Sequence, residues 1–330
     1  MLSIFKFLLN SLPVIFFSIL LLGISLANAQ SAYPNRPIKF IAPFPPGGTS
    51  DVIGRIMAQK MGDALGQPVI VENRPGAAGN IGHDIAAKSN PDGYTLLLSN
   101  NSTVVNNPYL YKQMSFDWYK DFSPISLVAI AGLVLVVHPS VPVKTVGELT
   151  ALIKSKPGQL NYGSGGKGIQ SHITGEMYKS TANLDIVHIP YKGTGLAVAD
   201  LVAGQIQIVF SDMAPAVPFI KANKLRALAV TSPQRSTTLP DLPTMIELGF
   251  PNFEAASWWS IVTPKGVSTS IIDRINHELG KIMTSSEIKD SFEKLGVTPL
   301  HSEPSKVFEL SRKESPITGE ILRKAGVERE

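Results

Sequence analysis

Two short glycine-rich stretches are the parts of this sequence whose residue types and spacing could do chemistry. The first, Pro45-Pro46-Gly47-Gly48-Thr49-Ser50, ends in residues that favour a helix start. The second, Ser164-Gly165-Gly166-Lys167-Gly168, also lies between a short strand-like run and a helix-like pattern. A loop that opens a helix presents unpaired backbone N–H groups at the positive end of the helix dipole. Both stretches therefore predict a site for an anion, and we expect that anion to be a carboxylate.

One carboxylate is expected to lie between the two loops, held by backbone N–H groups and by hydroxyl groups beside the glycines. Such a site needs no Lys or Arg side chain, so Lys167 and Lys192 are expected at solvated positions. The residues predicted for this clamp are Gly47, Gly48, Thr49, Ser50, Ser164 and Gly165.

Polar residues also come directly after two other predicted strands. Residues 99–103 follow a strand expected over 94–98, and ligands bind at the carboxyl ends of strands in open parallel sheets. Ser99 and Asn101 are therefore expected beside the first loop, with a solvated turn as the alternative. Asp212 stands at another strand end, where it either faces the ligand or caps the following helix.

The second loop partly matches a dinucleotide-binding motif. Gly163 to Gly168 fits the G-x-G-x-x-G pattern and follows a strand. The motif also requires an acidic residue at the end of the next strand, where this chain has Tyr191-Lys192. Glycine also follows Gly166-Lys167, where a phosphate-binding Walker A loop needs Ser or Thr. We therefore expect no nucleotide cofactor.

Ser164 could instead be the nucleophile of an exported serine hydrolase. Its surroundings resemble the G-x-S-x-G elbow, but Tyr162 stands where the sharp elbow needs a glycine. A base and an acid are available in the sequence at His172, His188 and Asp212. This hydrolase remains the alternative to a binding protein without catalytic residues.

The first 29 residues have the pattern of a signal peptide. Lys6 precedes an apolar run from Phe7 to Leu26, and Ala27-Asn28-Ala29 follows as an A-x-A cleavage site. We expect cleavage after Ala29 and export to the periplasm. An uncleaved membrane anchor is the alternative, because the apolar run is almost long enough to span a bilayer.

The composition of the chain excludes several classes of function. Its 330 residues include no cysteine, which excludes thiol catalysis, disulfides and thiolate metal sites. The six histidines show no metal-binding spacing, so no metal is expected. The net charge of +4 comes without a basic cluster, so nothing indicates a nucleic-acid partner.

Strands and helices alternate along the chain at the spacing of βαβ units, which predicts largely parallel sheets. The first loop lies between a strand at 38–42 and a helix whose apolar face extends to Leu65. A capping-box pattern from Thr145 to Glu148 starts another helix. Further strands are expected at 68–72, 94–98, 125–130, 133–138, 186–191, 206–210, 225–230 and 257–262. Further helices are expected at 81–88, 195–203, 214–222, 269–283, 286–294 and 304–325.

Gly132 separates two apolar runs and marks the expected crossing into a second domain. The C-terminal part is long enough to return to the first domain. We therefore predict a signal peptide at 1–29, a first α/β lobe at 30–130 and 250–330, and a second α/β lobe at 131–249.

Several short motifs occur in a fixed order along the mature chain. They are Tyr33-Pro34-Asn35-Arg36-Pro37-Ile38, Pro43-Phe44 through Gly47-Gly48 and Asp51, Val71-Glu72-Asn73-Arg74-Pro75-Gly76, Pro91-Asp92-Gly93-Tyr94-Thr95-Leu96, Leu160-Asn161-Tyr162, His188-Ile189-Pro190-Tyr191-Lys192-Gly193 and Leu225-Arg226-Ala227-Leu228-Ala229-Val230-Thr231. Together they resemble the Bug-type receptors, which are the extracytoplasmic solute-binding subunits of tripartite tricarboxylate transporters.

The resemblance implies a two-lobed periplasmic-binding-protein-like α/β fold, the type II or flytrap fold. It implies a small organic carboxylate or acidic amino acid as ligand, and the membrane components of a tripartite tricarboxylate transporter as partner. In the family, the loops that match 44–50 and 162–168 grip ligand carboxylates, which adds Phe44 and Gly168 to the predicted site. Relatives often carry small hydroxyl residues where this chain has Ile169-Gln170. Members of the family bind dicarboxylates, tricarboxylates, acidic amino acids and aromatic acids, so the resemblance does not fix the ligand.

Overall fold

The computed structural model describes residues 33–329. Residues 33–36 and residues 37–329 belong to different compact units, and the fold described here is that of the second unit. The predicted signal peptide and its cleavage after Ala29 lie outside the described residues. Within 33–329, no helix is both long enough and apolar enough to cross a membrane.

The first of two β-sheets joins strands from both ends of this unit. Its strands, in spatial order, are β11 (Thr298–Pro299), β4 (Phe122–Gly132), β10 (Ala256–Pro264), β3 (Thr95–Asn100), β1 (Ile38–Ala42) and β2 (Val69–Asn73). β1 is parallel to β2 and β3, whereas β10 is antiparallel to β3 and β4. The C-terminal part of the chain therefore returns to the first sheet through β10 and β11.

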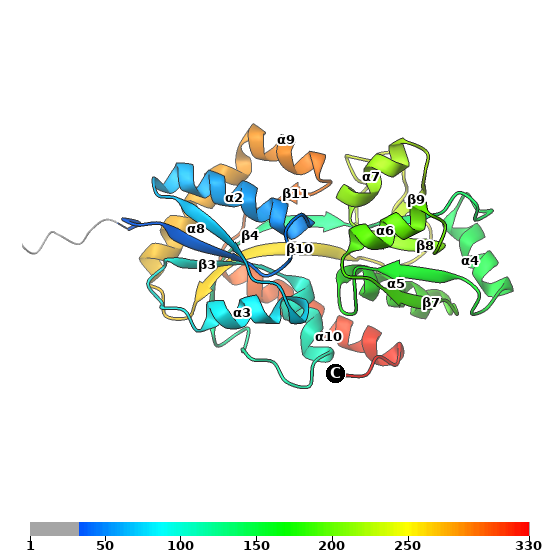
Figure 1. Cartoon of the computed structure of the whole chain (residues 1–330), viewed down its shortest axis with the longest axis horizontal. Helices are drawn as coiled ribbons and strands as arrows, with labels where there is room; N and C mark the ends of the chain where they lie inside the picture. Colours follow the sequence, from blue (N-terminus) through cyan, green and yellow to red (C-terminus); the bar gives the residue numbers. More distant parts are fainter. Residues whose placement is uncertain (1–32, 330) are drawn as a thin grey trace, which may run out of the picture. The chain divides into compact units, whose positions relative to one another are not determined.

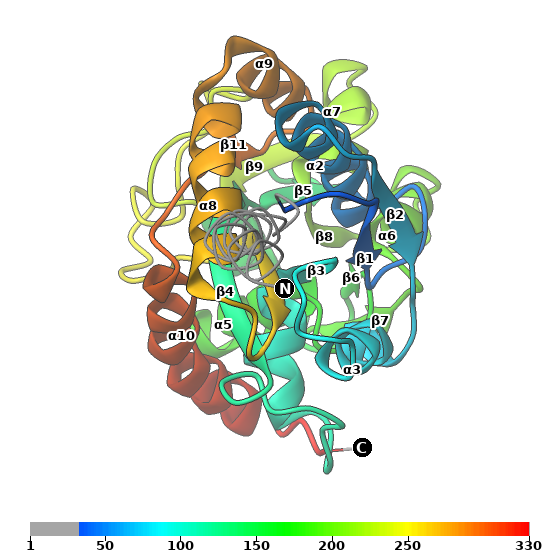
Figure 2. The same cartoon turned by 90° about the vertical axis from the view of Figure 1, so that its left-hand side faces the viewer.

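Helices cover both faces of this sheet. α2 (Thr49–Leu65) and α8 (Thr269–Thr284) lie over one face and contact each other, and α9 (Ser286–Lys294) follows α8 (Figure 2). α3 (Asn80–Ala87) and α10 (Ser305–Lys324) lie over the opposite face. Because both faces are covered, the inner strands β1 and β3 are mostly buried and mostly apolar.

The second sheet is built from the middle of the chain. Its strands, in spatial order, are β7 (Val187–Pro190), β6 (Asn161–Ser164), β8 (Ile208–Ser211), β5 (Val134–Val137) and β9 (Arg226–Val230). β6 is parallel to β7 and β8, whereas β5 is antiparallel to β8 and β9. The helices that pack on it are α4 (Val146–Ser155), α5 (Gln170–Ala182), α6 (Thr194–Val202) and α7 (Met213–Lys221).

Alternating side chains of β5 separate the two cores of the second sheet. Leu135 and Val137 pack in one cluster with residues of α4 and α5, whereas Val134 and Val136 pack in another with residues of α6 and α7. Successive strand residues point to opposite faces. The β5 segment is apolar at every position because helices cover both of its faces.

The chain passes between the two sheets twice. It leaves the first sheet with β4, enters the second with β5 and returns between β9 and β10, and Figure 1 shows β4 and β10 running from one group of elements toward the other. The buried Thr231 joins the two passages. Its hydroxyl group accepts a hydrogen bond from Leu133 N at 2.8 Å and donates to the Ala255 carbonyl at 2.5 Å. The result is the predicted two-lobed α/β fold, whereas the lobe boundaries at 130/131 and 249/250 stay predictions.

The structure differs from the sequence-based expectation at the end of the third strand. β3 extends to Asn100, so Ser99 is a strand residue paired with Ser260 of β10. The chain then forms a π-helical turn, η2 (Ser102–Asn106), and a 3₁₀ turn, η3 (Asn107–Tyr109). Both sheets are also mixed rather than largely parallel. The antiparallel pairings of β10 and β5 join segments far apart in the sequence, which local patterns do not reveal.

Other local predictions are confirmed. The side chain of Thr145 accepts a hydrogen bond from Glu148 N at 3.1 Å and caps α4. The helices expected at 269–283, 286–294 and 304–325 correspond to α8, α9 and α10. The two-residue strand β11 and the 3₁₀ turn η1 (Ala77–Gly79) are too short to leave a pattern in the sequence.

Candidate functional site

The first predicted loop connects β1 to α2, and two polar side chains fix its shape. Asp51 Oδ2 accepts a hydrogen bond from Gly47 N at 3.0 Å, and Asp51 Oδ1 accepts one from Asn73 Nδ2 at 2.8 Å. Asn73 also donates to the Phe44 carbonyl at 3.1 Å. Gly47 has a φ of 86°, which residues with a side chain rarely adopt. These contacts define the backbone path that leads into α2.

Asp51 remains charged although the residue is buried. Burial raises the pKa of its carboxyl group, but hydrogen bonds from Arg55, Gly47 and Asn73 lower the pKa below its usual value. Arg55 Nε lies 3.0 Å from Asp51 Oδ2, one turn further along α2. The carboxylate that shapes the loop is therefore balanced by a cation of the same helix.

The start of α2 has backbone donors that no side chain caps. Gly48 is the N-cap residue, with φ −82° and no side-chain cap hydrogen bond. The first N–H groups of a helix have no partner inside that helix, so Thr49 and Ser50 offer donors at the positive end of the dipole. The preceding residues 45–48 are exposed. This end of α2 can therefore receive an anion from solvent.

Trp259 orients the hydroxyl group of Ser50. Trp259 lies in β10, is only 3% exposed, and its Nε1 donates to Ser50 Oγ at 2.8 Å. An indole N–H can only donate, so the hydroxyl hydrogen of Ser50 is left to donate to another group. The two residues are 209 positions apart, which is why no local pattern predicts this contact.

Ser99, one of the predicted site residues, has a partner inside the first lobe. It is fully buried, and its Oγ lies 2.9 Å from His83 Nε2. His83 Nδ1 lies 2.9 Å from the Gly79 carbonyl, which can only accept, so Nδ1 carries the ring hydrogen. Ser99 therefore donates its hydroxyl hydrogen to His83, and a contact with a ligand stays a prediction.

Asn101 contacts elements of both lobes. Its Nδ2 donates to the Ala256 carbonyl of β10 at 2.8 Å and to Gln170 Oε1 of α5 at 3.3 Å. Asn106 makes a second link, because its Nδ2 donates to the Gly168 carbonyl at 2.7 Å. The segment after β3 thus holds the second glycine-rich loop against the first sheet. Sequence reasoning missed Asn106, because it lies in a turn without a recognisable motif.

The second loop uses much of its own backbone internally. Three of its N–H groups donate to nearby side chains: Gly165 N to Ser171 Oγ at 3.0 Å, Gly166 N to Ser164 Oγ at 3.1 Å, and Gly168 N to His172 Nδ1 at 3.1 Å. The expectation that these groups are free is therefore not met, because Ser171 and His172 in the first turn of α5 turn back onto the loop and Ser164 at the end of β6 binds Gly166. The N-cap residue Ile169 provides no side-chain cap, so the available donors lie in the first turn of α5 itself.

Ser164 and His188 form the first contact that a serine hydrolase would need. Ser164 Oγ lies 2.6 Å from His188 Nε2. However, Ser164 is fully buried, and its Oγ also bonds to the backbone of Gly166. Within residues 33–329, no acidic side chain hydrogen-bonds to His188, whose ring stacks on His172 with centroids 4.2 Å apart.

The two histidines have low basicity. Burial lowers the pKa of His188 to about 3 and the pKa of His172 to about 4. A general base works best when its pKa lies near the working pH. We therefore interpret the two rings as supports of the second loop, which they hold through Ser164 Oγ and Gly168 N.

Asp212 occupies the N-cap position of α7 without capping it. Its ψ is 151°, and its side chain makes no cap hydrogen bond. Burial raises the pKa of its carboxyl group above the usual value, and a hydrogen bond from Thr194 partly opposes this shift. Thr194 also packs on Gly165, where an added Cβ would lie 2.8 Å from Thr194 Oγ1. Asp212 is thus linked to the second loop through Thr194, and its contact with a ligand stays a prediction.

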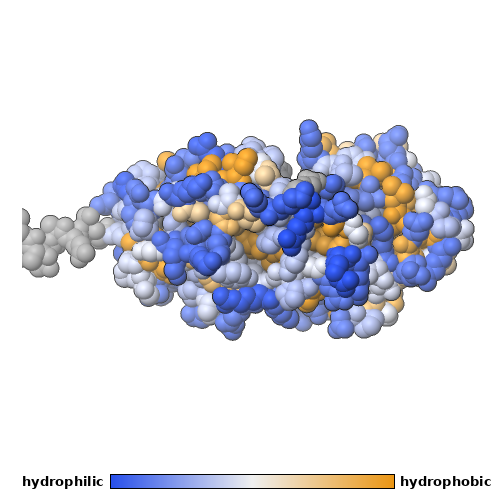
Figure 3. Space-filling view, turned by 90° about the horizontal axis from the view of Figure 1, so that it is seen from below, coloured by the Kyte–Doolittle hydropathy of each residue, from blue (hydrophilic) through white to orange (hydrophobic). Residues whose placement is uncertain are grey.

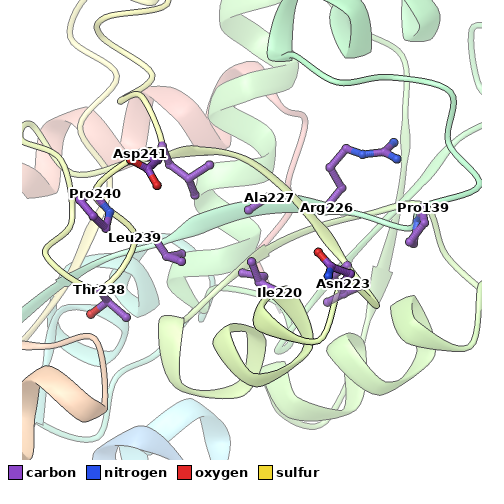
Figure 4. Close-up of a pocket in the computed structure, with 11 residues that line it drawn as sticks. Pro139, Ile220, Asn223, Arg226, Ala227, Thr238, Leu239, Pro240 and Asp241 are labelled. Atoms are coloured by element: carbon purple, nitrogen blue, oxygen red, sulfur yellow. The ribbon is translucent and has the colours of Figure 1, made fainter.

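A separate cavity of about 470 Å³ lies at β9 and the end of α7 (Figure 4). None of the predicted ligand-binding residues is part of its lining, so this cavity does not belong to the candidate site. The residues that line it are Pro139, Ile220, Asn223, Leu225, Arg226, Ala227, Thr238, Leu239, Pro240, Asp241 and Leu242.

Exposed apolar side chains are scattered over the surface. Ile81 and Ile85 of α3 and Ile317 of α10 are among the large apolar residues that are exposed. On the face seen in Figure 3, hydrophobic residues form small areas separated by hydrophilic ones. Such single residues are ordinary on protein surfaces and indicate no particular partner.

Comparison with known proteins assigns this architecture to a family. A family model described as "Tripartite tricarboxylate transporter family receptor" matches residues 53–327. The chain belongs to this receptor family. It is 38% identical to protein BugT of Bordetella pertussis over 309 residues, which are 93% of each chain. The predicted resemblance to Bug-type receptors is confirmed.

Two solved structures of similar proteins contain dicarboxylates. R. palustris Rpa4515 with adipate has a TM-score of 0.84 and 29% identity, covering 90% of this chain and 100% of that chain. MatC from Rhodopseudomonas palustris with bound malate has a TM-score of 0.79 and 26% identity, covering 88% and 100%. This receptor is thus a solute-binding protein of the predicted fold class, and the comparisons give no support to the hydrolase alternative.

The buried ring of His83 should make the stability of this receptor depend on pH. Burial lowers the pKa of its ring to about 4, and the hydrogen bond to Gly79 opposes that shift. An unfolded chain has a histidine pKa of about 6.5. Between pH 6.5 and pH 4 the unfolded state therefore binds more protons, so the free energy of unfolding falls as the pH falls.

Replacing His83 with glutamine should remove this contribution. Between pH 4.5 and 6, urea unfolding should show a pH slope smaller than that of the parent by up to about 1.4 kcal/mol per pH unit. His277→Gln is the matched control, because His277 is exposed and should leave the slope unchanged. Equal slopes for the parent and His83→Gln would contradict the assignment of a buried neutral ring.

Proposed function

We propose that this receptor is exported to the periplasm and binds a small organic carboxylate or acidic amino acid between its two lobes. It then delivers the ligand unchanged to the membrane components of a tripartite tricarboxylate-type transporter. The observation that carries this proposal is the uncapped start of α2. There the N–H groups of Thr49 and Ser50 lie beside a Ser50 hydroxyl group that Trp259 leaves free to donate.

The geometry around this point suits a carboxylate. Helix-start N–H groups and a hydroxyl donor satisfy the oxygens of an anion without a cationic side chain. Adipate and malate, which the two similar structures contain, are both dicarboxylates. Within residues 33–329, no group of His, Asp and Glu could hold a metal ion, and the proposed contacts need none.

The second lobe supplies the opposite side of the proposed site. The first turn of α5 and the Thr194–Asp212 pair lie beside the second loop, and Asn101 and Asn106 connect this region to the first lobe. The proposed lobes are 30–130 with 250–330, and 131–249. The proposed ligand-binding residues are Phe44, Gly47, Gly48, Thr49, Ser50, Ser99, Asn101, Ser164, Gly165, Gly168 and Asp212.

A thermal-shift screen tests the proposal. The panel contains adipate, malate, citrate, aspartate and benzoate, with putrescine and glucose as ligands of the wrong charge. A ligand that binds only the folded state at 100 times its Kd adds about 2.7 kcal/mol of stability. At least one acid should raise Tm while putrescine and glucose should not. If putrescine or glucose raised Tm and no acid did, the carboxylate proposal would be wrong.

A further inference from the structure

Glu314 is an acidic residue inside the junction between the lobes that the proposed carboxylate contacts do not use. It lies on α10, and its Oε2 accepts a hydrogen bond from Trp258 Nε1 at 2.8 Å. Trp258 is fully buried in β10, one of the two strands that lead from one sheet toward the other. The side-chain amide of Asn101 also lowers the pKa of the Glu314 carboxyl group as a hydrogen-bond donor. Glu314 thus contacts both the crossing strand and the residue that reaches the second lobe.

Asn101 has more acceptors than it has hydrogens to donate. Its Nδ2 carries two hydrogens. The acceptors around it are the Ala256 carbonyl at 2.8 Å, Gln170 Oε1 at 3.3 Å and the Glu314 carboxyl group. A charged acceptor makes the stronger hydrogen bond. A negative charge on Glu314 therefore draws Asn101 away from Gln170, whereas a neutral Glu314 frees a hydrogen for Gln170.

Gln170 links the competition between Glu314 and Gln170 for Asn101 to the proposed ligand site. It is the first residue of α5, directly after the second glycine-rich loop, and it is largely buried. The Asn101–Gln170 hydrogen bond joins the two lobes beside the proposed site. A change in that bond alters how firmly the first turn of α5, with its free N–H groups, is held against the first lobe.

We propose that Glu314 is a proton-linked positioning residue, whose protonation strengthens the Asn101–Gln170 contact and thereby the affinity for a carboxylate. This inference rests on the proposed function. A second effect has the same sign, because protonation of Glu314 also removes a negative charge from the neighbourhood of an anionic ligand.

The surroundings of Glu314 leave its charge without a buried partner. Burial raises the pKa of Glu314 to about 7, although hydrogen bonds from Trp258 and Asn101 and the charge of Lys313 oppose the shift. Lys313 is its exposed neighbour on α10. Of the other elements packed against α10, β4 and η2 contain no titratable residue, and in η3 the hydroxyl group of Tyr109 lies 3.1 Å from Ser315 Oγ. On α5, Glu176 and Lys179 pair with each other, and His172 accepts from Gly168 N.

Calorimetry with the acid that binds most tightly among adipate, malate, citrate, aspartate and benzoate tests the proposal. These acids are ionised above pH 6.5, apart from the last proton of citrate. The affinity of the parent protein should rise about fivefold or more between pH 8 and pH 6.5. Titrations at pH 7 in PIPES and in Tris, which differ in ionisation enthalpy, should also show uptake of a fraction of one proton per ligand bound.

Glu314→Gln keeps the size of the side chain and removes its charge. This variant should bind at every pH about as tightly as the parent does at pH 6.5, and its proton uptake should fall. Glu320→Gln is the matched control on the exposed side of α10 and should keep the pH profile of the parent. A purely structural role for Glu314 would shift the affinity but leave the pH profile intact.

The outcomes separate this inference from the function on which it rests. If an acid binds but the parent takes up no proton, or if Glu314→Gln keeps the pH profile of the parent, the role of Glu314 is refuted and the receptor function stands. If no acid binds at any pH, the proposed function and this inference fail together. The proton measurement on the parent decides the matter even if Glu314→Gln does not fold.

Discussion

Replacing Gly175 with alanine is expected to lower the free energy of unfolding by about 1–3 kcal/mol, the usual cost of overpacking a core. Gly175 lies inside α5, where alanine ordinarily favours a helix. Here an added Cβ would lie 2.2 Å from Cε2 and 2.7 Å from Cζ of Tyr162. The expected effect is therefore opposite in sign to the one that helix propensity predicts.

Tyr162 cannot move aside easily because its ring and its hydroxyl group are both held by neighbouring side chains. The ring is fully buried, its hydroxyl group donates to Glu176 Oε1 at 2.5 Å, and it stacks on His188 with centroids 4.8 Å apart. His188 in turn holds Ser164 Oγ. A displaced Tyr162 should thus disturb the second loop, so the variant should also bind carboxylates more weakly than the parent.

Gly147→Ala is the matched control in α4 of the same lobe. The nearest atom to its added Cβ would be Thr145 Oγ1 at 3.9 Å, so there is room for the methyl group. Alanine should raise the free energy of unfolding by about 0.5–1 kcal/mol at this position. Urea unfolding of both variants measures whether the free energy of unfolding falls in Gly175→Ala and rises in Gly147→Ala. If Gly175→Ala were as stable as Gly147→Ala, Tyr162 would not occupy the position described here.

Replacing Gly48 with valine is expected to weaken carboxylate binding roughly 100-fold while leaving folding almost unchanged. Its φ of −82° and ψ of 166° are extended values that suit a β-branched residue. Apart from the Pro45 carbonyl at 3.8 Å, no heavy atom outside the neighbouring residues lies within 4 Å of its added Cβ. The side chain would instead fill the approach to the free N–H groups of α2. Loss of two charge-assisted hydrogen bonds at about 1.5 kcal/mol each corresponds to that change in affinity.

The controls for Gly48→Val are Lys167→Ala and Lys192→Ala. Both lysines are exposed, and the proposed contacts involve neither side chain. Calorimetry should give these two variants the affinity of the parent, while urea unfolding should show Gly48→Val to be folded. If Gly48→Val kept full affinity and a lysine variant lost all binding, the anion would be bound by side chains elsewhere and the proposed site at the start of α2 would be wrong.

The repeated unit of strand, glycine-rich loop and helix could be predicted from the sequence, as could the helix from Thr49 to Leu65. These features depend on residues within one or two turns of each other. Helix periodicity, capping residues and glycine at the turns act locally, so they are visible without a structure. The ordered motifs likewise predict the family, because their coincidence along one chain is specific.

Only the tertiary structure shows which hydrogen-bond donors of the site are unpaired. Trp259 reaches Ser50 across 209 positions and leaves its hydroxyl hydrogen free, whereas Ser99 at a predicted ligand position gives its hydrogen to buried His83. Asn106 binds the carbonyl group of Gly168 in the second loop across 62 positions. A sequence shows where donors occur. Which donors remain unpaired depends on packing between distant segments, because each buried polar group takes whatever partner the folded chain brings to it.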